Sequence, residues 1–360
     1  MYPVSQRYLD EVAASVQTVT TVAEIVENGE VVASLPVDTN AGGDVDIDLE
    51  GAIRRDVSSV VVVDHDGALR ARLTPWGTEV RLRRGFVYKD GTREDCPMGL
   101  FRVTSSTPGY GYVGIDGSDR AHLAQAPSGA PLAVPGGLTI DEACRRLVAA
   151  RVPFAPFNGV QSEWLTPPLY LEYGADFWDQ AQQLAASGGY DLAFDATGAA
   201  VLRPATVYLD RVLRYAEDEN ATAFEVARAL SSDRVPNGII VQGENSHSDS
   251  PVLGQAWDMD PTSPTYRYGP YGEVAEVVRG EKVLTNLQAE ASARGILALR
   301  LGRAEQVSFD AVPNPAHDVG DVIEVVRPRL GLAGLYVIDS LSVPFQLGGA
   351  MKVTARRYIP

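Results

Sequence analysis

The sequence has few of the residues that build covalent crosslinks or metal sites. Its 360 residues include two cysteines and four histidines. Cys96 precedes a proline in a loop pattern and Cys144 falls in a helical pattern, which gives neither a disulfide framework nor a zinc motif. The histidines, at positions 65, 122, 247 and 317, are scattered along the chain. We therefore expect neither a metal nor a cofactor.

Long hydrophobic runs are also missing. No segment approaches the roughly 20 apolar residues that are needed to cross a bilayer. The first residues, Met1-Tyr-Pro-Val-Ser, lack the basic and hydrophobic regions of a signal peptide. We therefore expect synthesis in a cytoplasm and no stable membrane insertion.

Basic residues are outnumbered, with 31 Lys and Arg against 47 Asp and Glu, and the formal net charge is −16. Such a surface repels nucleic acid, which argues against sequence-specific DNA binding. No Ser-His-Asp order, nucleophile elbow or zinc-protease motif is present. Carboxylates are plentiful, so a glycosidase-type carboxylate pair stays open as an alternative.

Short alternating apolar runs dominate what is present. They predict a mainly β protein with an α+β insertion. A β-rich unit, a barrel or sandwich, is expected over 1–125, and a linker with a small mixed α/β domain over 126–205. A second β-rich unit follows over 206–360, with a helix at about 284–302. We find no sequence repeat that relates the two β units.

Local signals support several of these elements. Asn28-Gly29 between two β-branched runs predicts a tight hairpin turn. Thr139 and Glu142 have the spacing of a capping box, which predicts a helix start. A second helix is expected over 175–187, where apolar residues recur at helical spacing before two glycines. These signals place two helices in the α/β region.

An acidic stripe is the first candidate functional feature. Asp44, Asp46 and Asp48 alternate with apolar residues, so a strand would place the three carboxylates on one face. They imitate the start of a calcium loop, but Leu49 and Arg55 stand where that loop needs glycine and glutamate. A solvated strand face is the simpler interpretation, and a stripe that lines a channel is the functional one.

The segment 244–271 is the second candidate. It is rich in Ser, Pro and Gly and carries Trp257, Tyr266, Tyr268 and Tyr271. A loop of this length in a compact domain is commonly functional. Its aromatic residues suit a subunit or partner interface, and alternatively a platform on which sugars stack. We favour the interface.

Two further motifs have structural explanations. The stretch 109–114 reads Gly-Tyr-Gly-Tyr-Val-Gly, but no helix follows to receive a pyrophosphate, so a hairpin turn is expected. Asp64-His-Asp-Gly67 imitates a metal corner or an acid–base pair. No second histidine lies near it in sequence, and a turn that ends at the glycine is expected instead.

The last forty-odd residues carry a resemblance. Three expected strands lie over 319–326, 336–343 and 351–358, each ending near a proline. Their sequences, Val319-Gly-Asp-Val-Ile-Glu-Val, Gly334-Leu-Tyr-Val and Gly349-Ala-Met-Lys-Val-Thr-Ala-Arg-Arg, resemble the end of phage tail hub proteins. Near the front, Leu73-Thr-Pro-Trp-Gly-Thr-Glu-Val and Met98-Gly-Leu-Phe-Arg-Val look like tail proteins of actinobacterial siphophages.

The resemblance implies a minor tail protein that acts as the baseplate or tail-tip hub of a virion. Such hubs carry two tail-tube-like β-barrel domains per subunit and form homotrimers, so six barrels adapt a threefold tip to the sixfold tube. The implied partners are the distal tail protein or tail tube ring, the tape-measure protein and the central fibre proteins. DNA would pass through without specific binding. A trimer would carry a formal charge of −48, three times that of the chain.

Two other functions stay open at this point. A tail-associated cell-wall hydrolase would need a cleft with a carboxylate pair, and incubation with purified cell wall would reveal it. A carbohydrate-binding adhesion module would bind glycans as an isolated protein. The resemblance favours a structural protein without enzymatic activity over both.

Overall fold

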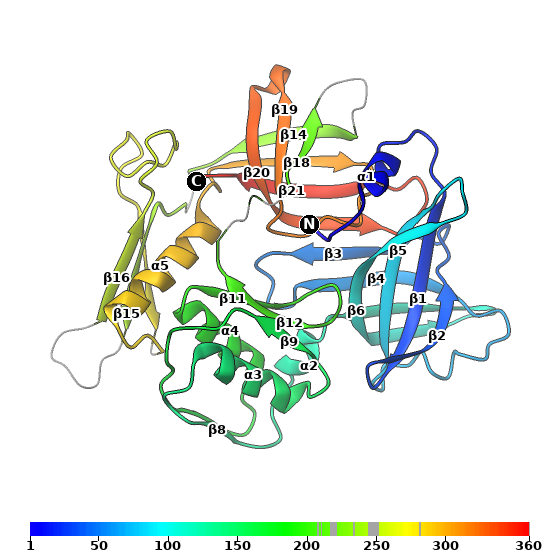
Figure 1. The fold of residues 1–360 in the computed structure, drawn as a ribbon, viewed down its shortest axis with the longest axis horizontal. Helices are drawn as coiled ribbons and strands as arrows, with labels where there is room; N and C mark the ends of the chain where they lie inside the picture. Colours follow the sequence, from blue (N-terminus) through cyan, green and yellow to red (C-terminus); the bar gives the residue numbers. More distant parts are fainter. Residues whose placement is uncertain are drawn as a thin grey trace.

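The computed structural model describes residues 1–206, 209, 211–216, 222–232, 235–243, 252–280 and 282–359. The predicted mainly β fold is confirmed, with a helical region between two strand-rich parts (Figure 1). No helix in these ranges is long and apolar enough to cross a membrane.

The elements fall into three stretches of the chain. The first contains α1 (Gln6–Val12), β1 (Val19–Glu27), β2 (Glu30–Pro36), β3 (Asp44–Asp48), β4 (Arg55–Val63), β5 (Glu79–Val87), β6 (Arg93–Pro108) and β7 (Tyr112–Ser118). The second contains α2 (Ala121–Gln125), β8 (Leu132–Val134), α3 (Ile140–Arg151), β9 (Phe157–Gly159), β10 (Leu169–Leu171), α4 (Phe177–Ser187), β11 (Tyr190–Phe194) and β12 (Ala200–Pro204). The third contains β13 (Leu213–Ala216), β14 (Ala223–Leu230), β15 (Gly238–Gly243), β16 (Val252–Trp257), β17 (Ala275–Gly280), α5 (Asn286–Arg300), β18 (Glu305–Ala311), β19 (Val322–Arg327), the 3₁₀ helix η1 (Pro328–Leu330), β20 (Leu332–Pro344) and β21 (Met351–Arg357).

One 13-stranded sheet joins the two β-rich units, while β15, β16 and β17 of the second unit form a separate sheet. Its main path runs β14-β18-β21-β20-β3-β4-β7-β6-β5-β1-β2, and β13 and β19 branch from β20. The two units meet where β3 pairs antiparallel with β20, so that Asp46 lies opposite Ser342. At the far end, a single bridge between Val37 and Val62 brings the chain after β2 back to β4. The sheet is therefore continuous across the predicted boundary between the units.

The two units repeat one strand topology, although no sequence repeat relates them. In the first unit β4 pairs with β3 and β7, and β6 pairs with β5 and β7. In the second, β18 pairs with β14 and β21, and β20 pairs with β19 and β21. The chain order is also the same, so β3, β4, β5, β6 and β7 correspond to β14, β18, β19, β20 and β21.

One matching irregularity aligns β6 with β20 residue by residue. The β6–β7 register shifts at Thr104, and the β20–β21 register shifts at Asp339. Five residues before each shift stands the same motif, Gly99-Leu-Phe in β6 and Gly334-Leu-Tyr in β20. Three residues separated by most of the chain are too short a repeat to recognise without the strand pairing.

One hydrophobic core lies under both β units. Alternate residues of β3 and β20, Val45, Ile47, Leu341 and Val343 among them, point into it and are nearly inaccessible to solvent. The helical region has a separate core around α3 and α4, and β15–β17 pack on α5 over a third. Each α/β part therefore folds around its own apolar interior.

Local predictions agree with the structure at most turns and helix starts. Asn28 and Gly29 have φ of 53° and 87°, as a two-residue hairpin turn requires. The capping box of Thr139 and Glu142 opens α3. The predicted linker 126–138 contains the short strand β8, which pairs with β10.

Residues 244–251 lie outside the described residues, and 258–271 contains neither helix nor strand. The interpretation of 244–271 as one long loop is wrong for the segment 252–257. This segment contains β16, which pairs antiparallel with β15, while β17 pairs parallel with β15. The buried face of β16 carries Val252, Gly254 and Ala256. A Cβ at Gly254 would lie 2.2 Å from the Ala289 carbonyl carbon of α5, so close packing against α5 explains the glycine at this buried position.

Candidate functional surfaces

The predicted acidic stripe lies in the middle of the large sheet. On β3, Asp44 is partly buried and Asp46 and Asp48 are exposed, while Val45 and Ile47 between them are buried. Because β3 lies between β4 and β20, the row continues onto both neighbours. The predicted placement of the three carboxylates on one face is therefore confirmed.

Strand register extends this face across both repeats. Asp46 lies opposite Asp56 of β4, and hydroxyl groups of β20 lie opposite Asp46 and Asp48. We call this surface the acidic sheet face; its carboxylates are Asp44, Asp46, Asp48, Asp56, Asp116 and Asp310. Lys352 of β21 lies opposite Asp310 and Ser342.

The carboxylates of the stripe repel one another. Burial raises the pKa of Asp44, and the neighbouring charge of Asp46 raises it further, while Lys352 opposes both effects. A shallow groove of about 310 Å³ lies over the same strands. Its polar lining consists of Asp46, Asp48, Asp56 and the hydroxyls of β20, together with Arg54 and Lys352. The face presents mainly acidic and small polar groups, with Lys352 as an exposed cation among them.

A second surface gathers three of the four predicted aromatic residues around one arginine. The Arg267 guanidinium lies 4.2 Å from the centroid of the Trp257 ring and 5.3 Å from that of Tyr268. The rings of Tyr266 and Tyr268 meet edge to face at 5.7 Å. We call these four residues the aromatic cluster. Since Arg267 covers one face of the indole ring, that face is closed to a stacked sugar.

Buried polar contacts hold the cluster in place. Asp258, 1% exposed, accepts hydrogen bonds from the hydroxyls of Ser263 and Thr265 at 2.5 and 2.7 Å. The Asn237 side chain donates to the Thr265 carbonyl at 2.7 Å. Tyr268 remains 64% exposed, whereas the Tyr271 hydroxyl donates to the Val235 carbonyl at 2.7 Å. Tyr271 therefore supports the loop, and Tyr268 is its exposed aromatic.

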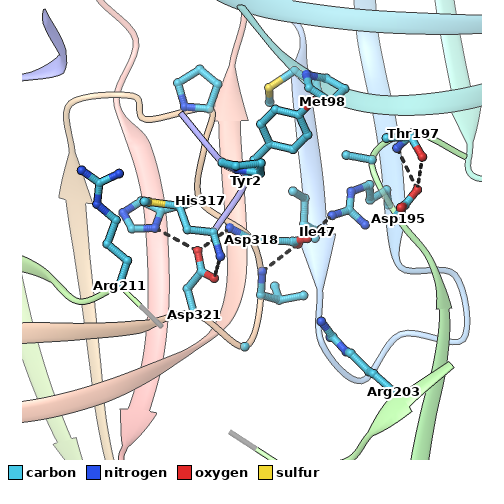
Figure 2. Close-up of a pocket in the computed structure, with 18 of the residues that line it drawn as sticks. Tyr2, Ile47, Met98, Asp195, Thr197, Arg203, Arg211, His317, Asp318 and Asp321 are labelled. Atoms are coloured by element: carbon cyan, nitrogen blue, oxygen red, sulfur yellow. Dashed lines mark hydrogen bonds and ion pairs between the residues drawn. The ribbon is translucent and has the colours of Figure 1, made fainter. Parts of the chain in front are cut away.

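A cavity of about 300 Å³ lies where the three parts of the chain meet (Figure 2). His317 and the terminal amine of Met1 both contact the Asp321 carboxylate, and the Tyr215 hydroxyl lies 2.8 Å from His317 Nε2. Burial alone would raise the pKa of Asp321, but the hydrogen bond and charge of His317, with the amine, outweigh it and lower that pKa. Asp195 on the opposite wall accepts from Thr197 at 2.7 Å. These carboxylates are engaged in structural contacts.

Buried arginines fasten the α/β region to the first β unit. Arg55 donates to the Phe194 carbonyl at 3.0 Å and to Asp318 at 2.6 Å. Arg120, 4% exposed, binds both oxygens of Glu79 at 2.7 and 2.8 Å and donates to the Gly198 carbonyl at 2.8 Å. No pattern in the sequence indicates this role, because arginine is ordinarily a surface residue.

The remaining motifs have the predicted structural roles. In 109–114, the Gly109 amide donates to the Tyr112 carbonyl and the β6–β7 hairpin turns there. At 64–67, the Gly67 amide donates to the Asp64 carbonyl in a turn. Cys96 and Cys144 are free thiols in buried positions. Within the described ranges no three His, Cys, Asp or Glu residues are grouped so that they could hold a metal ion; His247 lies outside those ranges.

Comparison of the sequence with protein families and with curated proteins gives no match. Solved structures do match. The tail protein of Neisseria meningitidis aligns with a TM-score of 0.61 at 14% identity, over 94% of this chain and 97% of that protein. The 43 kDa tail protein of prophage MuSo2 from Shewanella oneidensis aligns with a TM-score of 0.58 at 14% identity, over 94% and 98%. The chain has the fold of phage tail proteins.

The same fold extends to a secretion system. An Escherichia coli component of the type VI secretion system, described as similar to the T4 tail proteins gp27 and gp5, aligns with a TM-score of 0.54 at 12% identity, over 94% of this chain and 77% of that protein. These alignments include both β units and the α/β region. They confirm a mainly β fold similar to that of phage tail proteins, while the two tube-like barrels and the actinobacterial hub type stay predictions.

Proposed function

We propose that this protein is the hub subunit of a phage tail tip or baseplate, a structural protein that forms a homotrimeric ring below the tail tube. The observation that carries the proposal is the repeated topology of the two β units in one continuous sheet. A subunit with two equivalent units presents six of them when three copies assemble. Such a ring adapts the sixfold tube to a threefold tip.

The acidic sheet face supports a channel role within this ring. It continues across β18, β21, β20, β3, β4 and β7, so it spans the junction between the two units. Turned inward, its carboxylates would repel DNA phosphates and keep a passing duplex from binding to the wall. The distal tail protein or tube ring would contact one rim, the tip and fibre proteins the other, and the tape-measure protein would end inside.

Electron microscopy of the tail of the particle that carries this chain tests the proposal. We expect three copies in a ring at the tail tip, with the acidic sheet face toward the channel. A different position in the particle, or a ring with another number of copies, would contradict it. Retention of full tail assembly in particles without the chain would contradict it as well.

The aromatic cluster is proposed as the contact to a neighbouring subunit or tail protein. Tyr268→Ala removes its most exposed ring, and we expect incorporation of the chain into tails to fall on the order of tenfold, as for an interface hot spot. Quantitative immunoblotting of purified particles measures this. Tyr173→Ala is the matched control, since Tyr173 is 74% exposed on the α/β region. Normal particles that no longer bind cells would favour the sugar platform instead.

A further inference from the structure

Two strand edges remain open at opposite ends of the polar part of the sheet. Figure 1 shows this run of eight strands from β14 at the top, through β3, to β6. Among the described residues, β14 pairs with β18 alone, and the part of β6 after Val103 pairs with β7 alone. Leu230 on β14 is 66% exposed. Open edges of this kind are templates for another strand.

The repeat identifies what these edges fit. Within the chain, β20 pairs with β3, which joins the two units. By topology β20 corresponds to β6, and β3 corresponds to β14. The open edges of β6 and β14 are thus the counterparts of the two edges that already pair. We propose that β6 of one copy pairs antiparallel with β14 of a second copy, which deepens the proposed ring and rests on it.

The register of this contact is derived in two steps, beginning with the residues of β6 that correspond to those of β20. Alignment of the shifts at Thr104 and Asp339 makes Thr107 correspond to Ser342. It also makes Val103 correspond to Ile338, whose partners across the next strand are Gly117 and Ala355.

The second step identifies the residues of β14 that correspond to those of β3, by following paired residues from one strand to the next. Gly117 pairs with Val57, and Ala355 pairs with Val307, so these two valines correspond. Their next neighbours, Val45 and Arg228, correspond in turn, which matches Asp46 to Ala229. Ser342 lies opposite Asp46 within the chain. Thr107 of one copy therefore lies opposite Ala229 of the next, on the acidic sheet face.

Chemistry and exposure agree with this register. Thr107 and Ala229 are small, exposed side chains that allow two backbones to approach. The neighbouring pair, Ser106 with Leu230, falls on the opposite face, where Leu341 and Ile47 pair inside the chain. Pairing there would shield part of the exposed Leu230 side chain from water. The contact continues the sheet from copy to copy and leaves its polar face unbroken.

A cysteine crosslink tests the register in the assembled particle. In the chain with Thr107→Cys and Ala229→Cys, oxidation should yield crosslinked dimers and trimers on a non-reducing gel. Cys96 and Cys144 are buried and leave the background low. The control, Thr107→Cys with Leu230→Cys, is shifted by one residue and places the thiols on opposite faces. We expect on the order of tenfold more crosslinking in the first chain than in the control.

The results of this experiment test the pairing of β6 with β14 separately from the proposed trimeric ring. Trimers at the tip without a crosslink, or equal crosslinking in the control, would overturn the pairing and leave the ring. Absence of any ring would overturn both. Hydrogen exchange of the unsubstituted chain gives a second measurement: the amides of 104–108 and 223–230 should exchange more slowly in the particle than in the free chain. Unchanged exchange in assembled particles would also overturn the pairing.

Discussion

Particles in which Asp44, Asp46 and Asp48 are all replaced by lysine are expected to assemble and to eject DNA more slowly, on the order of tenfold at low salt. The substitution turns three negative charges in the middle of the acidic sheet face into three positive ones. If this face lines the channel, the lysines would bind the phosphates of the passing duplex. Because salt screens such contacts, the delay should shrink as ionic strength rises.

Fluorescence of released DNA after triggering of purified virions measures the rate. The triple Asp→Asn variant separates loss of repulsion from gain of attraction, and we expect it to fall between the two. Glu30→Lys on β2 is a control for added positive charge, since Glu30 is exposed and lies outside the acidic sheet face. Unchanged ejection in the triple lysine variant would remove the channel role of β3.

Arg120→Met is expected to lower the free energy of unfolding by about 3–5 kcal/mol, because it breaks a buried ion pair by removing one partner. Glu79, 15% exposed, would keep its charge without a counter-ion, and the Gly198 carbonyl would lose its donor. The α/β region would be held less firmly on the first β unit. Denaturant unfolding of the purified chain measures the change.

Two further variants serve as controls for the Arg120→Met prediction. Arg72→Met breaks a pair with Glu27 in which both side chains are about half exposed, and should change stability by about 1 kcal/mol or less. Arg120→Met combined with Glu79→Leu removes both charges and should recover part of the loss. If Arg120→Met costs no more than Arg72→Met, the buried pair does not hold the two parts together.

The sequence determined the local structure of this protein well. The hairpin turn at Asn28-Gly29, the capping box of Thr139 and Glu142, and the alternation over 44–49 were all predicted correctly. Each depends on backbone preferences and side-chain periodicity within a few residues, so the information lies in one short stretch. The resemblance of the terminal strands also led to the right fold.

The sheet and its repeat required the tertiary structure. The pairing of β3 with β20 joins Asp46 to Ser342 across most of the chain, and no local pattern specifies that partner. The same holds for β16, whose buried Gly254 is small because α5 packs against it, and for Arg120, whose burial depends on Glu79. Local preference decides which segments become strands and helices, whereas shape and charge complementarity between distant segments decide which of them meet.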